Sequence, residues 1–458
     1  MTNLSRRGFM ERAGLLAVAG SAAPFVLSLA AAGEAAAATA PDYKALVCIH
    51  LAGGNDYANT LIPADPARYA VYAQLRQGLA LSADSIAATT MTTPDPNAAL
   101  PGGQLYALAP SLAPLLPVWN AGRMAAVLNV GTLVQPVTKT QYNAHSAPLP
   151  PKLFSHNDQQ SYWLAGAPEG ANSGWGGRMG DLLQSGNGNA ALTCINPSGS
   201  TVFLAGNSAV QYSLTPKGPV VLNDNQAAVF GSTAVGDALR SLLTTPSAHL
   251  IENEVTRVGA RALTTAGQVS SALGNAPAIT TPFPPGSTLA AQLRMVAQMI
   301  ATSAAAGAKR QVFYVSLGSF DHHANLIGAH GALLADLGAA MRAFYDATVE
   351  LNVADRVTAF TASDFGRTLT SNGTGSDHGW GSMHFVMGGA VRGGRYYGAV
   401  PVLADDGPDD IGQGRLIPTT SVEQYAATMA SWFGVSDGDM PTVLPNLGNF
   451  NQRNLWFV

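Results

Sequence analysis

Continuous apolar runs, rather than alternating ones, recur along the chain after residue 44. Runs of this kind are typical of strands that are covered on both faces of a sheet. The pattern predicts seven strands, at Ala45–Leu51, Met124–Val130, Ala191–Ile195, Thr201–Leu204, Gln311–Leu317, Val357–Ala362 and His384–Met387.

Helical periodicity separates several of these runs. The clearest helix is predicted to begin near Leu326, because apolar residues recur at three- and four-residue steps as far as Leu351. It leads into the strand at Val357, so that a β-α-β unit extends from Gln311 to Ala362. The alternation predicts an α/β fold with a mainly parallel sheet and helices on both faces. Further helices are predicted at Ala248–Leu273, Leu289–Ala306 and Glu423–Phe433.

Two segments rich in Pro, Ser and Thr, Thr92–Gly103 and Ala276–Ser287, predict long surface loops. The second could mark a domain boundary, but the helix after it leads directly into the strand Gln311–Leu317. We therefore expect one domain, residues 41–458, with decorated loops.

The first 40 residues are expected to be an export signal. A twin-arginine sequence at 5–10, SRRGFM, precedes the apolar, Ala-rich stretch Gly14–Ala32, and small residues follow as far as Ala40. A retained anchor is the alternative, since about 19 apolar residues could just span a bilayer. Pro24 and the many Ala and Gly residues weaken that alternative. We expect twin-arginine export to the periplasm or the extracellular space, with the membrane contacted only through the signal.

Composition narrows the function classes. The chain has 47% hydrophobic and 11% charged residues with a net charge of −4, so it can bury a large core. It has no Lys/Arg cluster, which argues against nucleic-acid binding. The two cysteines, Cys48 and Cys194, lie inside apolar runs without Cys-x-x-Cys spacing. They are expected to be buried hydrophobic residues rather than a disulfide, a nucleophile or zinc ligands.

Acids and imidazoles follow three of the predicted strands. Asp56 follows Gly53-Gly54-Asn55, Asp321 and His323 follow the Gln311–Leu317 strand, and Asp364 ends the next strand before a loop with His378. Ligands bind beyond the carboxyl ends of strands in α/β sheets. Carboxylates and imidazoles are the usual ligands of zinc and similar ions when cysteine is absent. The pattern predicts a metal-dependent hydrolytic site, with the divalent ion (Zn, Ca, Mn or Mg) left open.

Each residue also has a structural explanation. Asp56 could form a turn through its own backbone, and Asp364 could cap a helix. His322 or His323 alone would more often be a surface or hydrogen-bonded histidine. The joint pattern on successive strand ends favours a site.

Six motifs follow one another along the chain: LAGGNDYANTLIP, LFSHNDQQSYW, SGWGGRMGD, FDHHAN, TASDFGRTLTSNGTGSDHGWG and FVMGGAVRGGRYYG. Through these ordered motifs the chain resembles the bacterial domain of unknown function 1501 family over almost all of its mature length. That family in turn resembles the alkaline phosphatase superfamily of phosphatases, sulfatases and cofactor-independent phosphoglycerate mutases. The resemblance implies a three-layer α/β/α sandwich and metal ligands at Asp56, Asp321, His323, Asp364 and His378.

The chain departs from the superfamily pattern in two places. The mid-chain Asp and His stand two residues apart rather than four, and Phe365 follows the later strand-end acid where the relatives have a histidine. One metal position is therefore expected to be lost, or rebuilt with His156 or Asp377.

In the superfamily a Ser, Thr or modified Cys nucleophile follows an early strand, near a helix start and a metal ion. The resemblance implies Ser155 as the candidate nucleophile, since it precedes a predicted helix at Gln159–Leu164 and a helix N-terminus favours an oxyanion or phosphate. The alternative is an N-cap with Asp158 in a variant of the capping box, with water activated by a metal ion as the attacking group. Arg367 could hold an anionic substrate through its fork of donors. A structural role, for example as an ion-pair partner of Asp377, is favoured slightly.

Three functions remain open from the sequence. The first is an exported metal-dependent hydrolase of phosphate or sulfate esters, small or polymeric. The second is a catalytically silent secreted binding or assembly protein with a remnant metal site. The third is a hydrolase of another bond that uses one metal ion and water. Asp364-Phe365-Gly366 matches the kinase metal motif without its partner motifs, and no G-x-S-x-G or Walker sequence occurs.

Overall fold

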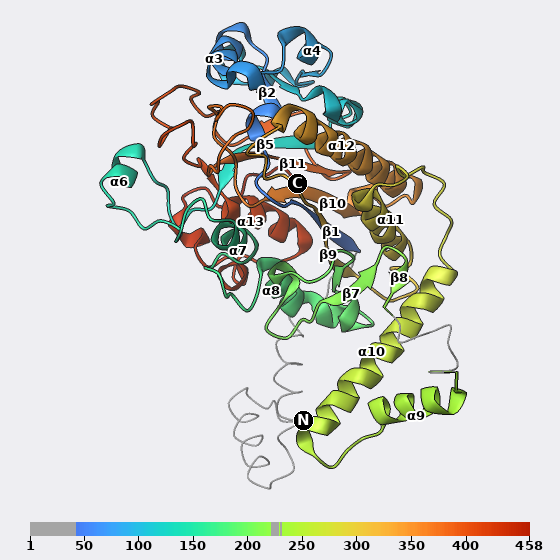
Figure 1. Ribbon diagram of the computed structural model, residues 1–458. Coiled ribbons are helices and arrows are strands. Elements are labelled where there is room, and N and C mark those ends of the chain that lie inside the picture. Colours follow the sequence, from blue (N-terminus) through green and yellow to red (C-terminus); the bar gives the residue numbers. More distant parts are fainter. Residues whose placement is uncertain (1–42, 221–228, 230) are drawn as a thin grey trace, which may run out of the picture.

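A computed structural model of the protein describes residues 43–220, 229 and 231–458. The predicted export signal lies outside these described residues. They form a mixed α/β fold around a large, mostly parallel sheet with the strand order β12-β5-β11-β10-β1-β9-β6-β7-β8, and β13 pairs with β5 (Figure 1). The strands are β1 (Lys44–Leu51), β5 (Met124–Gly131), β6 (Cys194–Asn196), β7 (Tyr212–Thr215), β8 (Gly218–Pro219), β9 (Arg310–Leu317), β10 (Val357–Ser363), β11 (Ser382–Gly388), β12 (Tyr396–Tyr397) and β13 (Thr420–Ser421).

Strand β1 lies between β10 and β9 and is parallel to both. Leu51 pairs with Ser363 on one side and with Leu317 on the other, so the three strands end side by side. This register places the segments that follow them at one edge of the sheet. A separate small sheet has the order β2-β4-β3 and is formed by β2 (Leu61–Pro63), β3 (Thr90–Met91) and β4 (Tyr106–Leu108).

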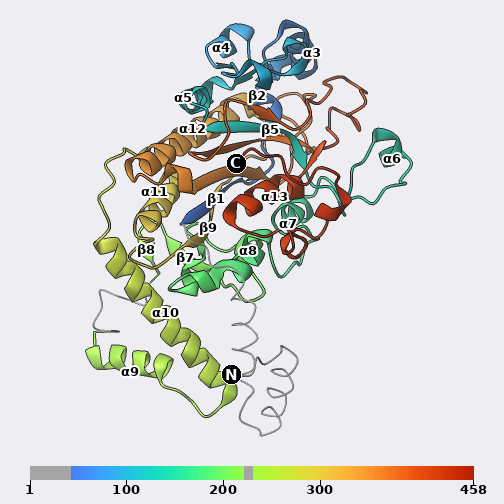
Figure 2. The ribbon, with the colours of Figure 1, turned by 180° about the vertical axis from the view of Figure 1, so that it is seen from behind.

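Helices cover both faces of the large sheet, as Figures 1 and 2 show from opposite sides. Val47 and Ile49 of β1 belong to one core together with residues of α11 (Thr288–Ala301) and α12 (Leu326–Glu350). Leu46 and Cys48 belong to the other core, with residues of α7 (His156–Ala165), α8 (Trp175–Leu183) and α13 (Val422–Phe433). Burial on both faces explains why the strand sequence is apolar throughout.

The remaining helices lie around this body. The helices α9 (Thr233–Thr244) and α10 (Leu250–Gly274) form a hairpin that projects from it (Figures 1 and 2). The predicted helices at 248–273, 289–306 and 423–433, and the one beginning near Leu326, are confirmed with shifts at their ends. The shorter helices are α3 (Pro66–Arg76), α4 (Ala83–Ala87), α5 (Leu116–Asn120), α6 (Lys139–Asn143) and α14 (Met440–Val443).

One predicted strand is wrong. Thr201–Leu204 does not join the sheet, and Val202–Leu204 instead forms a short 3-10 helix that Thr201 caps with its hydroxyl. The segment packs against α8, whose glycines permit close contact: a Cβ on Gly177 would lie 2.1 Å from the carbonyl carbon of Ala205. These glycines hide the helical pattern of α8 in the sequence, since glycine disfavours helix interiors.

Both cysteines are buried and unpaired, as the sequence predicts. Burial raises the pKa of the Cys194 thiol to about 12 and also raises that of Cys48, so neither is a ready nucleophile. Among the helices of the described residues, none is both long and apolar enough to cross a membrane.

Glu423, in the first turn of α13, makes the stability of the fold depend on pH. Its side chain is buried, accepts a hydrogen bond from Asn446 through Oε1 and leaves Oε2 without a partner among the described residues. Burial raises the pKa of Glu423 from 4.5 to about 7, against the smaller opposing effect of Asn446. The folded state therefore holds this proton more tightly than the unfolded state.

We predict that the free energy of unfolding contributed by Glu423 falls as the pH rises from about 4.5 to about 7, by roughly 3 kcal/mol. Glu423→Gln should remove this loss, because the amide stays neutral. Urea unfolding at pH 5 and pH 8 measures it, and an equal pH dependence of the two proteins would contradict the assignment.

Candidate metal centre

The segments after β9 and β10 meet at the carboxyl edge of the sheet. Asp364 follows β10 directly, and Asp321 lies four residues beyond the end of β9. The turn after β1 passes between them: the Gly53 amide donates to Asp364 Oδ2 at 3.1 Å, and a Cβ on Gly53 would lie 2.6 Å from the Asp321 nitrogen. With φ at +114°, this position requires glycine on conformational grounds as well.

Imidazole nitrogens and a carboxylate converge at this edge. His156, the first residue of α7, has its Nε2 3.1 Å from His378 Nε2 and 3.4 Å from Asp321 Oδ2. The Asp321 Oδ1 lies 3.1 Å from His378 Nε2. His323 joins from the outer side, with its Nε2 3.0 Å from His378 Nε2 and 3.1 Å from Asp321 Oδ1. We call His156, Asp321, His323 and His378 the His/Asp cluster.

The other ring nitrogen of each histidine faces an acceptor. His156 Nδ1 donates to Asp364 Oδ2 at 2.7 Å, and His378 Nδ1 donates to the Phe154 carbonyl at 2.8 Å. His323 Nδ1 donates to Asp377 Oδ1 at 3.0 Å. A neutral imidazole that donates from Nδ1 presents a lone pair at Nε2. Three lone pairs therefore point at the Asp321 carboxylate and at one another.

Such an arrangement fits a divalent cation. Facing lone pairs 3.0–3.1 Å apart repel each other, and a proton can relieve one such contact whereas a shared cation relieves all of them. In a tetrahedral zinc site with bonds of about 2.0–2.1 Å, ligand atoms lie roughly 3.3 Å apart. The ligand atoms of His156, Asp321 and His378 all lie within 4.8 Å of one another, and the separations above match that spacing. Carbonyl and carboxylate partners on the remote nitrogen are typical of metal-binding histidines.

Asp364 accepts the hydrogen bond from His156 Nδ1 and is not itself in the His/Asp cluster. Burial alone would raise the pKa of this carboxyl, but His156 and the buried His50 outweigh that effect and lower it to about 2. His50 Nε2 lies 3.3 Å from Asp364 Oδ1, although not in hydrogen-bond geometry. In return, the hydrogen bond to Asp364 raises the pKa of His156. Sequence reasoning missed His50, whose only signal is an imidazole within an otherwise apolar strand.

Phe365 and Arg367, which follow Asp364 in the chain, both lie against the His/Asp cluster. The ring of Phe365 packs against both His156 and His378, with centroids 4.8 and 4.7 Å apart, and so walls the site instead of ligating. The buried Arg367 donates to Asp321 Oδ1 at 2.8 Å and to the Gly53 carbonyl at 3.0 Å. Its ion-pair partner is therefore Asp321 and not the expected Asp377. Desolvation opposes this pairing, which nonetheless lowers the pKa of Asp321.

Asp56 is not brought into the His/Asp cluster. Its carboxylate is buried and accepts from Arg76 at 2.9 Å, from the Ser376 hydroxyl at 2.7 Å and from the Asn59 amide at 3.0 Å. This is the turn and cap role that the sequence left open. His322 also points elsewhere: it is buried near His330, with ring centroids 6.0 Å apart.

Ser155 lies next to the His/Asp cluster in the chain, at the N-cap position of α7. Its hydroxyl donates to Asp158 Oδ2 at 3.0 Å and does not accept from the backbone of the helix, so the predicted variant of the capping box does not form. Asp158 is buried and also faces the Lys152 ammonium at 3.6 Å. A carboxylate that accepts the hydroxyl proton can act as a base for that hydroxyl.

Strained backbone surrounds the His/Asp cluster. Phe154, whose carbonyl holds His378, has φ at +73°, and Ser319 and Asn325, which flank the Asp321–His323 segment, have φ at +75° and +52°. Positive φ in residues other than glycine is uncommon and concentrates at functional sites.

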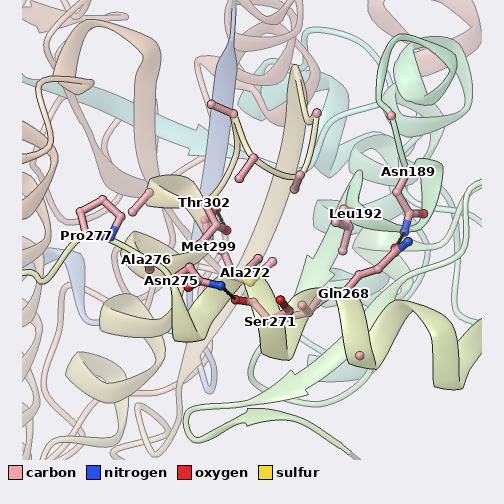
Figure 3. A pocket seen from close by; sticks show the side chains of 18 residues that line it. Asn189, Leu192, Gln268, Ser271, Ala272, Asn275, Ala276, Pro277, Met299 and Thr302 are labelled. Atoms are coloured by element: carbon pink, nitrogen blue, oxygen red, sulfur yellow. Dashed lines mark hydrogen bonds between the residues drawn. The ribbon is translucent and has the colours of Figure 1, made fainter.

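The large groove in Figure 3 is a different region of the molecule. It has a volume of about 890 Å³ and is lined mainly by small and amide side chains from α10, the end of α11 and the 188–192 loop. Gln268 and Asn189 join across it by a hydrogen bond of 2.9 Å. Its lining precedes β6 and β9, at the amino ends of these strands, so it lies at the edge opposite the His/Asp cluster.

Together, the fold and site define an α/β protein with a candidate metal centre beyond its strand ends. The chain belongs to a family described as "Protein of unknown function (DUF1501)", whose profile matches residues 43–444.

Two solved structures are similar at a low level. The crystal structure of Ps i-CgsB in complex with k-i-k-neocarrahexaose has 11% sequence identity and a TM-score of 0.31, and that of Ps i-CgsB has 13% and 0.34. Each alignment covers 88% of this chain and 77% of the other. A likeness this weak carries no conclusion about function. No curated protein matches the chain.

We predict that the protein binds one zinc ion per chain and that His378→Ala lowers the affinity at least 100-fold, because the central ligand is lost. Asp377→Asn should cost about 10–100-fold, since it supports His323 without ligating. Isothermal titration calorimetry of the metal-stripped protein with zinc measures both.

His322→Ala is the matched control, since His322 neighbours the ligands in sequence and points away from them. Equal losses in His322→Ala and His378→Ala would refute the ligand assignment.

Proposed function

We propose that this protein is an exported, metal-dependent hydrolase of phosphate or sulfate esters, built on a three-layer sandwich of the alkaline phosphatase type. His156, Asp321 and His378 would hold one divalent ion, with His323 as a further ligand. The observation that carries the proposal is the convergence of three histidine Nε2 atoms on one carboxylate at the strand ends. The choice of ester class rests on the resemblance of the family, to which the ordered motifs belong, to the alkaline phosphatase superfamily.

A bound divalent ion would supply Lewis-acid stabilisation of the ester oxygens and lower the pKa of water in the site. The chain's own residues provide the setting. Asp364 and Asp377 fix the tautomers of His156 and His323, and the ring of Phe365 excludes water from the inner side of two imidazoles. The outer side is open, since the side chains of Asp321 and His323 are 43% and 46% exposed, so a substrate can approach from there.

Arg415 is the best-placed group for holding the anionic part of an ester. Arg367, the sequence candidate, is buried and occupied by Asp321, Gly53 and Ser376. Arg415 donates from Nε to the His378 carbonyl at 2.8 Å and is partly exposed. Its Nη2 makes no hydrogen bond to any described residue, so it can donate to a substrate. We assign Arg367 the positioning of Asp321 and Arg415 the binding of the substrate anion.

Two attacking groups fit this setting. Water is favoured, because no hydrogen bond among the described residues joins the Ser155 hydroxyl to the His/Asp cluster. The alternative is Ser155 itself, with Asp158 Oδ2 taking its proton over 3.0 Å. Ser155→Ala separates them: activity within about threefold of wild type supports water, and loss with trapped phosphate on wild-type Ser155 supports the serine.

The proposal predicts zinc-dependent turnover of 4-nitrophenyl phosphate or 4-nitrophenyl sulfate that Asp321→Asn abolishes. Arg415→Met should lower kcat/KM by about 10–100-fold, because one charge-assisted hydrogen bond to the anion is lost. Zinc affinity should stay unchanged in Arg415→Met, and this separates substrate binding from metal binding.

Steady-state kinetics with the metal-loaded protein decide the matter. Stoichiometric zinc binding without turnover of either ester would overturn the hydrolase and leave the silent binding protein. Turnover that is unchanged by Asp321→Asn would overturn the site.

A further inference from the structure

The α9–α10 hairpin exposes an unusual amount of apolar surface. Seven of the fourteen exposed large apolar side chains among the described residues lie on these two helices, which form under a tenth of the chain. The C-terminal part of α10 is anchored to the body, where Ala266 and Val269 are buried. The N-terminal part of α10 and the whole of α9 project away from the body (Figures 1 and 2).

Six of these seven residues, all except Leu250, are ordered in two stripes. On α9 they are Val235, Leu239 and Leu242, and on α10 they are Ile251, Val255 and Val258. Both stripes follow the steps i, i+4 and i+7, which place three side chains on one face of a helix. Steps of three and four apolar residues form the packing seam in helical bundles and coiled coils.

These stripes do not form the contact within the hairpin. The two helices approach each other at Gly259, where a Cβ would lie 2.7 Å from the Leu243 carbonyl oxygen. Thr256 is the buried residue nearby, whereas α9 has no buried residue at all. The small residues close the hairpin, and the larger apolar residues are left on its outer faces.

The amino-acid composition of the hairpin indicates which kind of partner would cover these faces. Residues 233–274 contain no Phe, Trp, Tyr or Lys. Helices that lie on membranes usually carry aromatic anchors and a Lys/Arg-rich polar face, and hot spots for other proteins are enriched in Trp and Tyr. Leu, Ile and Val stripes are instead typical of the core of a helical bundle.

Charge also permits two hairpins to meet. The acidic residues Asp237, Glu252 and Glu254 are balanced by Arg240, Arg257 and Arg261, so like hairpins do not repel each other through net charge. In an isologous dimer the same surface of both copies meets across a two-fold axis, so each stripe would face a stripe of the second copy. Two hairpins then supply four helices.

We propose that the α9–α10 hairpin is a self-association surface, which pairs two copies of this chain through a four-helix bundle formed by the stripes 235/239/242 and 251/255/258. The six stripe residues of each copy are fewer than the roughly 20–30 residues a side of a standard interface, so dissociation constants on the order of micromolar are expected. The His/Asp cluster lies on the main body at the carboxyl ends of the strands, so pairing does not depend on the proposed hydrolase.

Sedimentation equilibrium from about 1 to 100 µM tests this proposal. The full chain of 47.1 kDa should approach twice that mass as concentration rises. Val255→Glu should weaken the association at least tenfold, because it places a charge in the seam. Thr264→Glu, an exposed α10 position off the stripe, should leave the association unchanged.

Three results would overturn the proposal. The first is a monomer at every concentration, and the second is a dimer that Val255→Glu leaves intact while circular dichroism shows the variant folded. The third is evidence for another occupant of the stripes. Association that requires residues 1–40 would be such evidence, and so would binding to phosphatidylcholine or phosphatidylglycerol vesicles that Val255→Glu removes.

Discussion

The candidate site depends on one constraint: every histidine of the His/Asp cluster has its Nδ1 hydrogen-bonded to an oxygen that can only accept. Asp364, Asp377 and the Phe154 carbonyl supply these oxygens. Each bond fixes a ring orientation and leaves the Nε2 lone pair facing the same small region. Without these bonds the rings could rotate or change tautomer, and the three Nε2 lone pairs would no longer be directed at one place.

The fold supplies those oxygens by its register. Because β1, β9 and β10 end side by side, the turn at Gly53 reaches both Asp364 and the backbone of Asp321. The bridge between Arg367 and His378 folds the loop after β10 back over the strand ends. The buried guanidinium of Arg367 forms an ion pair with Asp321, the carboxylate that the three histidines of the His/Asp cluster face. The site is therefore a property of the sheet edge and not of a single loop.

The sequence predicts the central strands well, because burial on both faces makes β1, β9 and β10 uniformly apolar. It also predicts α12, because the buried face of that helix places apolar residues at regular three- and four-residue steps. It misses α8, where glycines required by close packing conceal the helix, and it misplaces Thr201–Leu204, whose apolar residues fill the groove beside that helix. An apolar run of four residues does not distinguish a strand from a short 3-10 helix that packs against α8.

Local spacing also predicts part of the site. Asp321 and His323 face one side because they stand two apart, and His322 faces the other. Their meeting with His156 depends on contacts across more than 160 residues, which no spacing encodes. Asp56 shows that a position after a strand is not enough to predict a ligand. Its carboxylate forms an ion pair with Arg76, twenty residues later in the chain, and does not join the His/Asp cluster.

Phe365 connects these observations. Directly after the strand-end acid Asp364, this chain has an aromatic ring packed against two imidazoles, and the buried guanidinium of Arg367 lies beside Asp321. Both features favour our proposal that the His/Asp cluster holds one ion rather than two. Anomalous diffraction at the zinc edge from crystals of the zinc-loaded protein tests this directly. The account predicts a single peak within bonding distance of the Nε2 atoms of His156 and His378 and the carboxylate of Asp321. A peak at Asp56, two peaks, or none at the His/Asp cluster would contradict it.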